Sequence, residues 1–127
     1  MHESTFTRAI NKKLPTEIYV WKVNARYAPG VPDCWYSGPT GDLWIEWKYL
    51  PKMPKRHKPK LSALQSNWLN SRYDEGRNVA VLVGSPEGVA IYEDKAWDDQ
   101  KSITQLYSRI EIARWIHSRL DNKVKAP

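Results

Sequence analysis

Gly30 to Lys48 reads Gly-Val-Pro-Asp-Cys-Trp-Tyr-Ser-Gly-Pro-Thr-Gly-Asp-Leu-Trp-Ile-Glu-Trp-Lys, and this stretch decides how the chain folds. It contains two strand-like runs, Asp33 to Tyr36 and Leu43 to Lys48. The segment between the runs holds two glycines and a proline, which is the composition of a tight turn. The pattern therefore predicts a β-hairpin.

The position of the turn predicts the register of this hairpin. If the turn is centred on the Pro39–Thr40 bond, residues whose numbers sum to 79 lie opposite each other, so Tyr36 faces Leu43. By the same rule Asp33 faces Glu46. Directly opposed residues in antiparallel strands have Cβ atoms about 4.5–5.5 Å apart, and like charges there are destabilising. A divalent cation between the two carboxylates would remove that repulsion.

A lysine joins the two acids on the same face of the hairpin. Lys48 and Glu46 project together because side chains along a strand alternate with a period of two, and Ile45 and Trp47 point to the other face. Asp33, Glu46 and Lys48 thus form a cluster of two acids and one ammonium group. This composition suits a hard divalent metal ion held beside a phosphate.

The composition indicates one packed domain spanning residues 1–127. The chain has 127 residues, enough for a single core, and 41% of them are hydrophobic. Its single cysteine, Cys34, excludes an internal disulfide and cysteine-based zinc sites, and it fits a reducing compartment. No apolar run approaches the roughly 20 residues of a membrane span, and the N-terminus has no signal-peptide core. We therefore expect a cytoplasmic protein with no membrane contact, from a bacterial or phage-infected host cell.

Basic residues are concentrated in one proline-rich segment, residues 51–60. The formal net charge of the chain is +6. This segment contains no acidic residue, and it contains five cations: Lys52, Lys55, Arg56, Lys58 and Lys60. Interleaved prolines disfavour helix and central-strand structure, so an exposed loop is predicted. A charge run of this kind is ordinarily a solvated loop. Because it directly follows the predicted metal site, a loop that binds DNA phosphates is the better interpretation.

Hydrophobic spacing and helix signals predict the remaining elements. They are a helix over 3–13, a strand over 17–27, a helix over 61–74, a buried strand over 78–84, its hairpin partner over 88–93 and a last helix over about 108–121. Leu64 is expected in the apolar stripe of the helix over 61–74. The pairs Ser62 with Gln65 and Ser108 with Glu111 have the capping-box pattern. This order predicts an α/β fold in which a central mixed sheet is flanked by helices.

The chain resembles a known nuclease superfamily at these residues. Val31-Pro32-Asp33 followed by Glu46-Trp47-Lys48 is similar to the Pro-Asp…(Asp/Glu)-x-Lys motif of the PD-(D/E)XK nucleases. The run from Lys60 to Leu69, with the strand from Val79 to Val83, resembles the VRR-NUC branch of that superfamily. The resemblance extends from about residue 3 to residue 83, and the basic segment is longer than the short link usual in the family. After residue 93 no motif carries over.

This resemblance implies a restriction-endonuclease-like core and a metal-dependent active site. Asp33 and Glu46 would bind Mg²⁺, for which Mn²⁺ is a plausible substitute, and the backbone carbonyl of Trp47 would complete the protein ligands. Lys48 would orient the attacking water or help to deprotonate it, and would stabilise charge on the phosphate.

Two further residues match the family pattern and also have a structural interpretation. Glu3 matches a helix carboxylate that often joins the metal site, but a carboxylate in the first turn is also stabilised by the helix dipole. Gln65 matches a polar residue at the start of the following helix, but it is also the capping-box partner of Ser62.

The chemistry of the cluster agrees with such an enzyme. Phosphodiester hydrolysis needs an activated water and stabilised charge on the non-bridging oxygens, which a carboxylate-bound metal and a lysine supply. We therefore expect a DNA endonuclease, either structure-selective for junctions or flaps or a small phage or mobile-element nuclease. The alternative is a non-catalytic basic DNA-binding module whose acids are surface groups. A small chain that faces two DNA strands is also expected to act as a homodimer or higher homo-oligomer.

Overall fold

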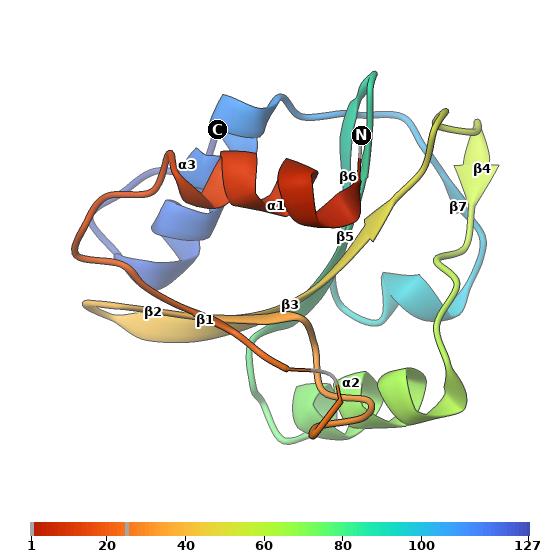
Figure 1. The fold of residues 1–127 in the computed structure, drawn as a ribbon, viewed down its shortest axis with the longest axis horizontal. Coiled ribbons are helices and arrows are strands. Elements are labelled where there is room, and N and C mark those ends of the chain that lie inside the picture. The colour runs from red at the N-terminus through yellow and green to blue at the C-terminus, as the bar shows by residue number, and fades with distance from the viewer. Residues whose placement is uncertain (1, 25) are drawn as a thin grey trace.

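A computed structural model describes residues 2–24 and 26–127 of the chain. These residues form a five-stranded sheet between two layers of helices (Figure 1). The strand order is β1-β2-β3-β5-β6, with bounds Tyr19–Lys22, Cys34–Gly38, Gly41–Tyr49, Val79–Ser85 and Gly88–Tyr92. The sheet is mixed, because β3 and β5 are parallel while the other neighbours are antiparallel. The predicted mixed sheet flanked by helices is confirmed.

Helices cover both faces of this sheet. α1 (Glu3–Asn11) and α3 (Arg109–Leu120) lie over one face, and α2 (Ala63–Asp74) lies against the other (Figure 1). The capping boxes predicted for α2 and α3 are both present, with Ser62 and Ser108 as the N-cap residues. Within the described part of the chain, none of the helices has the length and apolarity needed to cross a membrane.

β2 and β3 form the predicted hairpin in the predicted register. Tyr36 pairs with Leu43 and Cys34 pairs with Ile45. β2 begins at Cys34, whereas β3 continues four residues beyond the partner of Cys34, to Tyr49. The second half of β3 therefore keeps a strand neighbour, β5, on one side only. This free edge is where the predicted cluster of acids lies.

Two hydrophobic clusters fill the space between the sheet and its helices. The cluster under α1 and α3 includes Phe6, Ile45 and Trp47, and the cluster under α2 includes Leu69 and Val81. All seven residues of β5 are buried, as expected for a strand covered on both faces.

The first strand is shorter than the sequence pattern predicts. β1 ends at Lys22, where the prediction carried a strand through residue 27. Asn24 causes the early end, because its backbone carbonyl accepts a hydrogen bond from Tyr27 N and its side chain accepts one from Arg26 N. Asparagine side chains that bond nearby backbone groups in this way compete with strand pairing.

The basic segment is largely exposed, as predicted for a loop, but two of its residues form a short strand that the prediction did not include. β4 (Arg56–His57) pairs with β7 (Lys101–Ser102) in a separate two-stranded sheet. The pairing is possible because these two residues lie between prolines rather than at one. A short 3-10 helix, η1 (Ala96–Asp98), precedes β7.

Aromatic residues line the α2 side of β1, β2 and β3. Trp21, Trp35 and Trp44 form a row across the three strands, and Trp68 of α2 packs on Trp44 with ring centroids 5.1 Å apart. α2 covers only part of this row, so Trp21 stays 48% exposed. Leu64 was predicted in the apolar stripe of α2 but is 58% exposed, because it lies in the first turn while the buried Leu69 lies further along the helix.

The close contact between α1 and β5 gives a test of the packing. A Cβ added at Gly84 of β5 would lie 2.3 Å from two ring atoms of Phe6, which is buried, whereas a Cβ at Gly41 of β3 would meet its nearest neighbour, Arg119 O, at 3.4 Å. We expect Gly84→Ala to lower the free energy of unfolding by about 1–3 kcal/mol, as overpacking does. Gly41→Ala is the matched control and should change it by about 0.5 kcal/mol or less. Urea denaturation measures both, and equal stability of the two variants would contradict this packing.

Candidate active site

Asp33 is held at the free edge of β3 by its own carboxylate. Oδ2 of Asp33 accepts a hydrogen bond of 2.9 Å from the backbone N–H of Trp47, which has no strand partner on this side. The backbone carbonyl of Asp33 accepts a second bond, 2.8 Å, from Val23 N. The carboxylate thus continues the hairpin ladder one step beyond the start of β2, and its position is fixed by the backbone.

The backbone carbonyl of Trp47 lies on the same edge as Asp33. The N–H and C=O of one strand residue point to the same side. Trp44 N and Leu50 N both bond to the β5 side of the sheet, at 3.0 Å and 2.8 Å, so even-numbered residues of β3 face β5. Trp47 therefore directs its backbone groups away from β5, and its carbonyl is available as a ligand beside the Asp33 carboxylate.

Glu46 is buried beside these groups, with one oxygen paired and the other free. Its side chain is only 3% exposed. Oε2 accepts a hydrogen bond of 3.1 Å from Gln65 Nε2 and lies 3.3 Å from Lys48 Nζ. Among the described residues Oε1 has no hydrogen-bond partner, although it is shielded from solvent. A buried carboxylate oxygen without a partner is costly unless a cation or a proton meets it.

The capping box of α2 aims Gln65 at Glu46. Ser62 Oγ accepts from Gln65 N at 3.1 Å, and Gln65 Oε1 accepts from Ser62 N at 2.9 Å. With its oxygen used in the cap, the amide of Gln65 turns its Nε2 donor toward the carboxylate. The sequence offered a cap and a site residue as alternatives for Gln65, and its side chain makes both contacts.

Burial raises the pKa values of both acids, and the charge of Asp33 adds to the shift of Glu46. Burial, followed by the charge of Asp33, raises the pKa of Glu46 to about 7 from its ordinary 4.5, although Lys48 opposes the shift. Burial also raises the pKa of Asp33, against the hydrogen bond from Trp47 N–H and the charges of Lys48 and Lys22. Without a metal ion, the protein therefore favours a proton on Glu46 near neutral pH.

Two residues from other elements complete the surroundings of the acids. Glu3, in the first turn of α1, has its pKa raised by burial and then by the charge of Asp33. Lys22 at the end of β1 acts electrostatically on both Glu3 and Asp33, and it lies beside α1, because it lines a depression together with Ser4 and Thr7. The sequence placed Lys22 on one face of the first strand, toward solvent or DNA phosphates, but did not connect it with the acids, because its strand meets the hairpin only through the antiparallel pairing of β1 with β2.

The donor set at this edge fits a hard divalent cation. It offers two carboxylates and a backbone carbonyl, which are the oxygen ligands that Mg²⁺ prefers, and the partnerless Oε1 of Glu46 provides a free coordinating atom. In residues 2–24 and 26–127, the ligand atoms of Glu3, Asp33 and Glu46 do not all lie within 4.8 Å of one another.

The basic segment begins beside α1. Glu3, Tyr49 and Pro51 line a shallow depression of about 430 Å³, together with His2 and Pro86. The side chains of the five predicted DNA-binding cations are all exposed: Lys52, Lys55, Arg56, Lys58 and Lys60. The hairpin acids, the first turn of α1 and the start of the cationic segment thus occupy one region of the molecule.

Comparison with known proteins bears on the fold. No protein-family model matches this sequence, and no curated protein matches it significantly. The structure is similar to that of Hjc, a Holliday junction resolvase from the hyperthermophilic archaeon Archaeoglobus fulgidus, with a TM-score of 0.56. The match covers 87% of this chain and 94% of that chain at 15% sequence identity. It confirms the predicted restriction-endonuclease-like core, while the assignment to the VRR-NUC branch stays a prediction.

The raised pKa of Glu46 predicts how stability depends on pH in the metal-free protein. Between about pH 4.5 and about pH 7 the folded protein keeps a proton that the unfolded chain has lost, so stability falls as the pH rises through this window. Each pKa unit corresponds to about 1.4 kcal/mol. Glu46→Gln removes this loss, so the variant should gain stability relative to wild type as the pH rises.

Urea denaturation in EDTA between about pH 5 and about pH 8 measures the difference between the two proteins. Asp99→Asn, at an exposed acid outside the site, is the control for loss of one charge. A difference between Glu46→Gln and wild type that stays constant over this range would contradict the shift.

Proposed function

We propose that this protein is a divalent-metal-dependent endonuclease that hydrolyses phosphodiester bonds in DNA. The observation that carries the proposal is the pairing of Asp33 with the buried Glu46, whose Oε1 lacks a hydrogen-bond partner, beside Lys48. Two ionised acids with raised pKa values destabilise the fold unless a cation joins them or a proton neutralises one of them. Such perturbed groups gather at functional sites.

Each residue of the cluster has a role in this proposal. Asp33, Glu46 and the carbonyl of Trp47 would hold Mg²⁺, or Mn²⁺ in its place, and the bound ion would polarise the phosphate and lower the pKa of a bound water. Gln65 keeps the Glu46 carboxylate oriented through its 3.1 Å hydrogen bond. Lys48, a quarter exposed, is the donor that reaches solvent and the phosphate, and it stabilises the charge that develops there.

Glu3 and Lys22 are proposed to act at the margin of the site. Glu3 is coupled electrostatically to Asp33 and Lys48, so it can bind the ion through a water molecule. Lys22 adds a second positive charge close to the acids. It is placed to bind a phosphate next to the one that is cleaved.

The proposed substrate is branched DNA, such as a four-way junction. The fixed, exposed cations of the basic segment supply a phosphate-binding surface beside the acids, and the protein of similar fold is a Holliday junction resolvase. Cleavage of two strands calls for two sites, so we also propose a homodimer. The partly exposed aromatic row around Trp21 is a suitable contact surface, and light scattering with and without DNA tests this state.

The alternative, a basic DNA-binding module without catalysis, leaves the acids unexplained. Acids that are merely surface groups remain solvated, whereas Glu46 is 3% exposed and lies in the interior beside Asp33. DNA binding alone does not require a buried carboxylate pair. The same basic segment serves both functions, so only the acids and Lys48 separate the two hypotheses.

Removing one member of the cluster should abolish cleavage. We expect Asp33→Asn and Lys48→Ala each to reduce the rate of four-way-junction cleavage in Mg²⁺ by about 100-fold or more, because each removes charge stabilisation from the transition state. Asp99→Asn and Lys125→Ala, at exposed positions outside the site, are the matched controls and should cleave like wild type.

The assay includes wild type in EDTA and, for all variants, a DNA-binding measurement that confirms folding. If the wild-type protein binds junctions but does not cleave junctions, flaps or plasmid DNA in Mg²⁺ or Mn²⁺, the result would favour the non-catalytic binding module. Full activity of Asp33→Asn would also exclude the proposed site.

The basic segment should determine the salt dependence of DNA binding. Replacing Lys55, Arg56 and Lys58 together by Gln should weaken binding and reduce the slope of log K against log salt by up to about 3, since each phosphate contact contributes about 0.9. A matched triple variant at exposed lysines elsewhere, Lys12, Lys13 and Lys125, should leave the slope nearly unchanged. Equal slopes for wild type and the first variant would mean that the segment is only solvated.

A further inference from the structure

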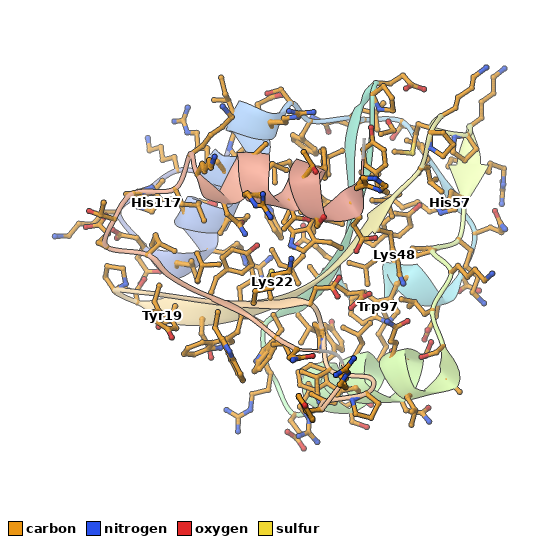
Figure 2. The ribbon with its side chains drawn as sticks, in the orientation of Figure 1. Tyr19, Lys22, Lys48, His57, Trp97 and His117 are labelled. Atoms are coloured by element: carbon orange, nitrogen blue, oxygen red, sulfur yellow. The ribbon has the colours of Figure 1, made fainter. Side chains whose placement is uncertain are left out.

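A second group of potential metal ligands lies away from the candidate active site. Glu17, His117 and Asp121 each offer one ligand atom, and these atoms all lie within 4.8 Å of one another. We call this group the His117 cluster. His117 and Lys48 lie at well-separated places in Figure 2, so the cluster is distinct from the acids at the edge of β3.

The fold brings the three residues together from two distant parts of the chain. His117 lies in the last turn of α3 and Asp121 is the C-cap residue of that helix, and the backbone N–H of Asp121 donates a hydrogen bond of 3.0 Å to the carbonyl of His117, which keeps the two residues close. Glu17 lies in the turn between α1 and β1, close to this end of α3. Lys123 N bonds to Oδ1 of Asp121 at 3.0 Å, which leaves Oδ2 to face the histidine.

The spacing of the ligand atoms is close to that of a tetrahedral metal site. His117 Nε2 lies 3.4 Å from Glu17 Oε1 and 4.0 Å from Asp121 Oδ2. Metal–ligand bonds of about 2.0–2.2 Å place tetrahedral ligands about 3.3–3.6 Å apart. The His117–Glu17 pair already has this separation, the His117–Asp121 pair would close by about half an ångström, and the ligand atoms of Glu17 and Asp121 lie within 4.8 Å of each other. Small side-chain rotations would therefore complete three protein ligands.

The histidine nitrogen has no other partner to explain its position. Among the described residues Nε2 of His117 has no hydrogen-bond partner and is shielded from solvent. Its contacts with the two carboxylates are ion-pair distances without hydrogen-bond geometry. Glu17 is 56% exposed, so an ion could enter from solvent and keep water as its fourth ligand. Lys13 and Arg114 line the adjacent depression, and their positive charges offset those of the two carboxylates. Direct coordination by the three side chains, rather than a negative electrostatic potential, must therefore hold the ion.

We propose that Glu17, His117 and Asp121 bind a divalent transition-metal ion, with Zn²⁺ as the best match. One imidazole nitrogen and two carboxylate oxygens are ligands that zinc accepts, whereas Mg²⁺ prefers oxygen ligands alone. The bound ion ties the C-terminal end of α3 to the turn that leads into β1. This site is independent of the proposed nuclease activity, because it shares no residue with the acids of the hairpin.

Calorimetric titration of the full chain with Zn²⁺ tests the proposal. The titration uses the Asp33→Asn, Glu46→Gln background, so that the hairpin acids do not contribute. One equivalent of Zn²⁺ should bind to the background protein. His117→Gln should weaken Zn²⁺ binding by about tenfold or more, because loss of a residue that only hydrogen-bonds to a metal ligand already lowers metal affinity by about 10-fold to 100-fold. His57→Gln, which removes a histidine outside the cluster, is the matched control and should bind like the background protein.

A second variant and a spectroscopic measurement guard against effects on folding. Asp121→Asn should also weaken Zn²⁺ binding, and thermal melting in EDTA shows whether each variant remains folded. The imidazole NMR signals of His117 should shift on addition of Zn²⁺ and remain in place on addition of Mg²⁺. Absence of Zn²⁺ binding to the background protein, or equal affinity in folded His117→Gln and Asp121→Asn, would overturn the proposal and leave an ordinary ion pair.

Discussion

The placement of two carboxylates side by side at the edge of β3 is the constraint on which the rest of the structure depends. Asp33 and Glu46 repel each other, and burial makes both charges more expensive. The fold counters this with the Trp47 N–H on Asp33 and with Gln65 and Lys48 on Glu46. These three donors contact Oδ2 of Asp33 and Oε2 of Glu46, and they leave Oε1 of Glu46 without a hydrogen-bond partner among the described residues. A structure that merely tolerated two acids would not leave that oxygen both buried and free.

The support for this pair comes from elements whose own stability does not depend on it. α2 begins with a capping box that any helix could use, yet the same box fixes the amide of Gln65 against Glu46. β3 is held by β5, which is buried along its whole length, so its second half keeps a strand neighbour without β2. The site is thus built on a strand and a helix terminus rather than on a loop. Rigid elements of this kind hold ligand atoms in position before an ion or substrate arrives.

Local patterns predicted the hairpin and its register, and distant contacts account for what they missed. The register followed from the turn composition and the two-residue period, and it placed Asp33 near Glu46 correctly. The relation of Lys22 to the acids was missed, because it depends on a pairing between β1 and β2 that no local signal shows. Glu17 and His117 are separated by most of the chain, so only the fold joins them. The exposure of Leu64 was also missed, because helical spacing identifies a stripe but not how far a helix covers its sheet.

The C-terminal third carried no motif, yet it contacts two parts of the proposed DNA-binding region, the basic segment and α1. β7 pairs with β4, and Ile103 N bonds to Lys55 O at 2.8 Å, so the chain after η1 fixes the path of the basic segment. α3 packs against α1, the helix that carries Glu3. A cationic segment already held in place loses less conformational entropy when it binds phosphates than a free loop does. The residues without a motif therefore hold α1 and the cations in fixed relation to the acids of the hairpin, which is their part in the proposed function.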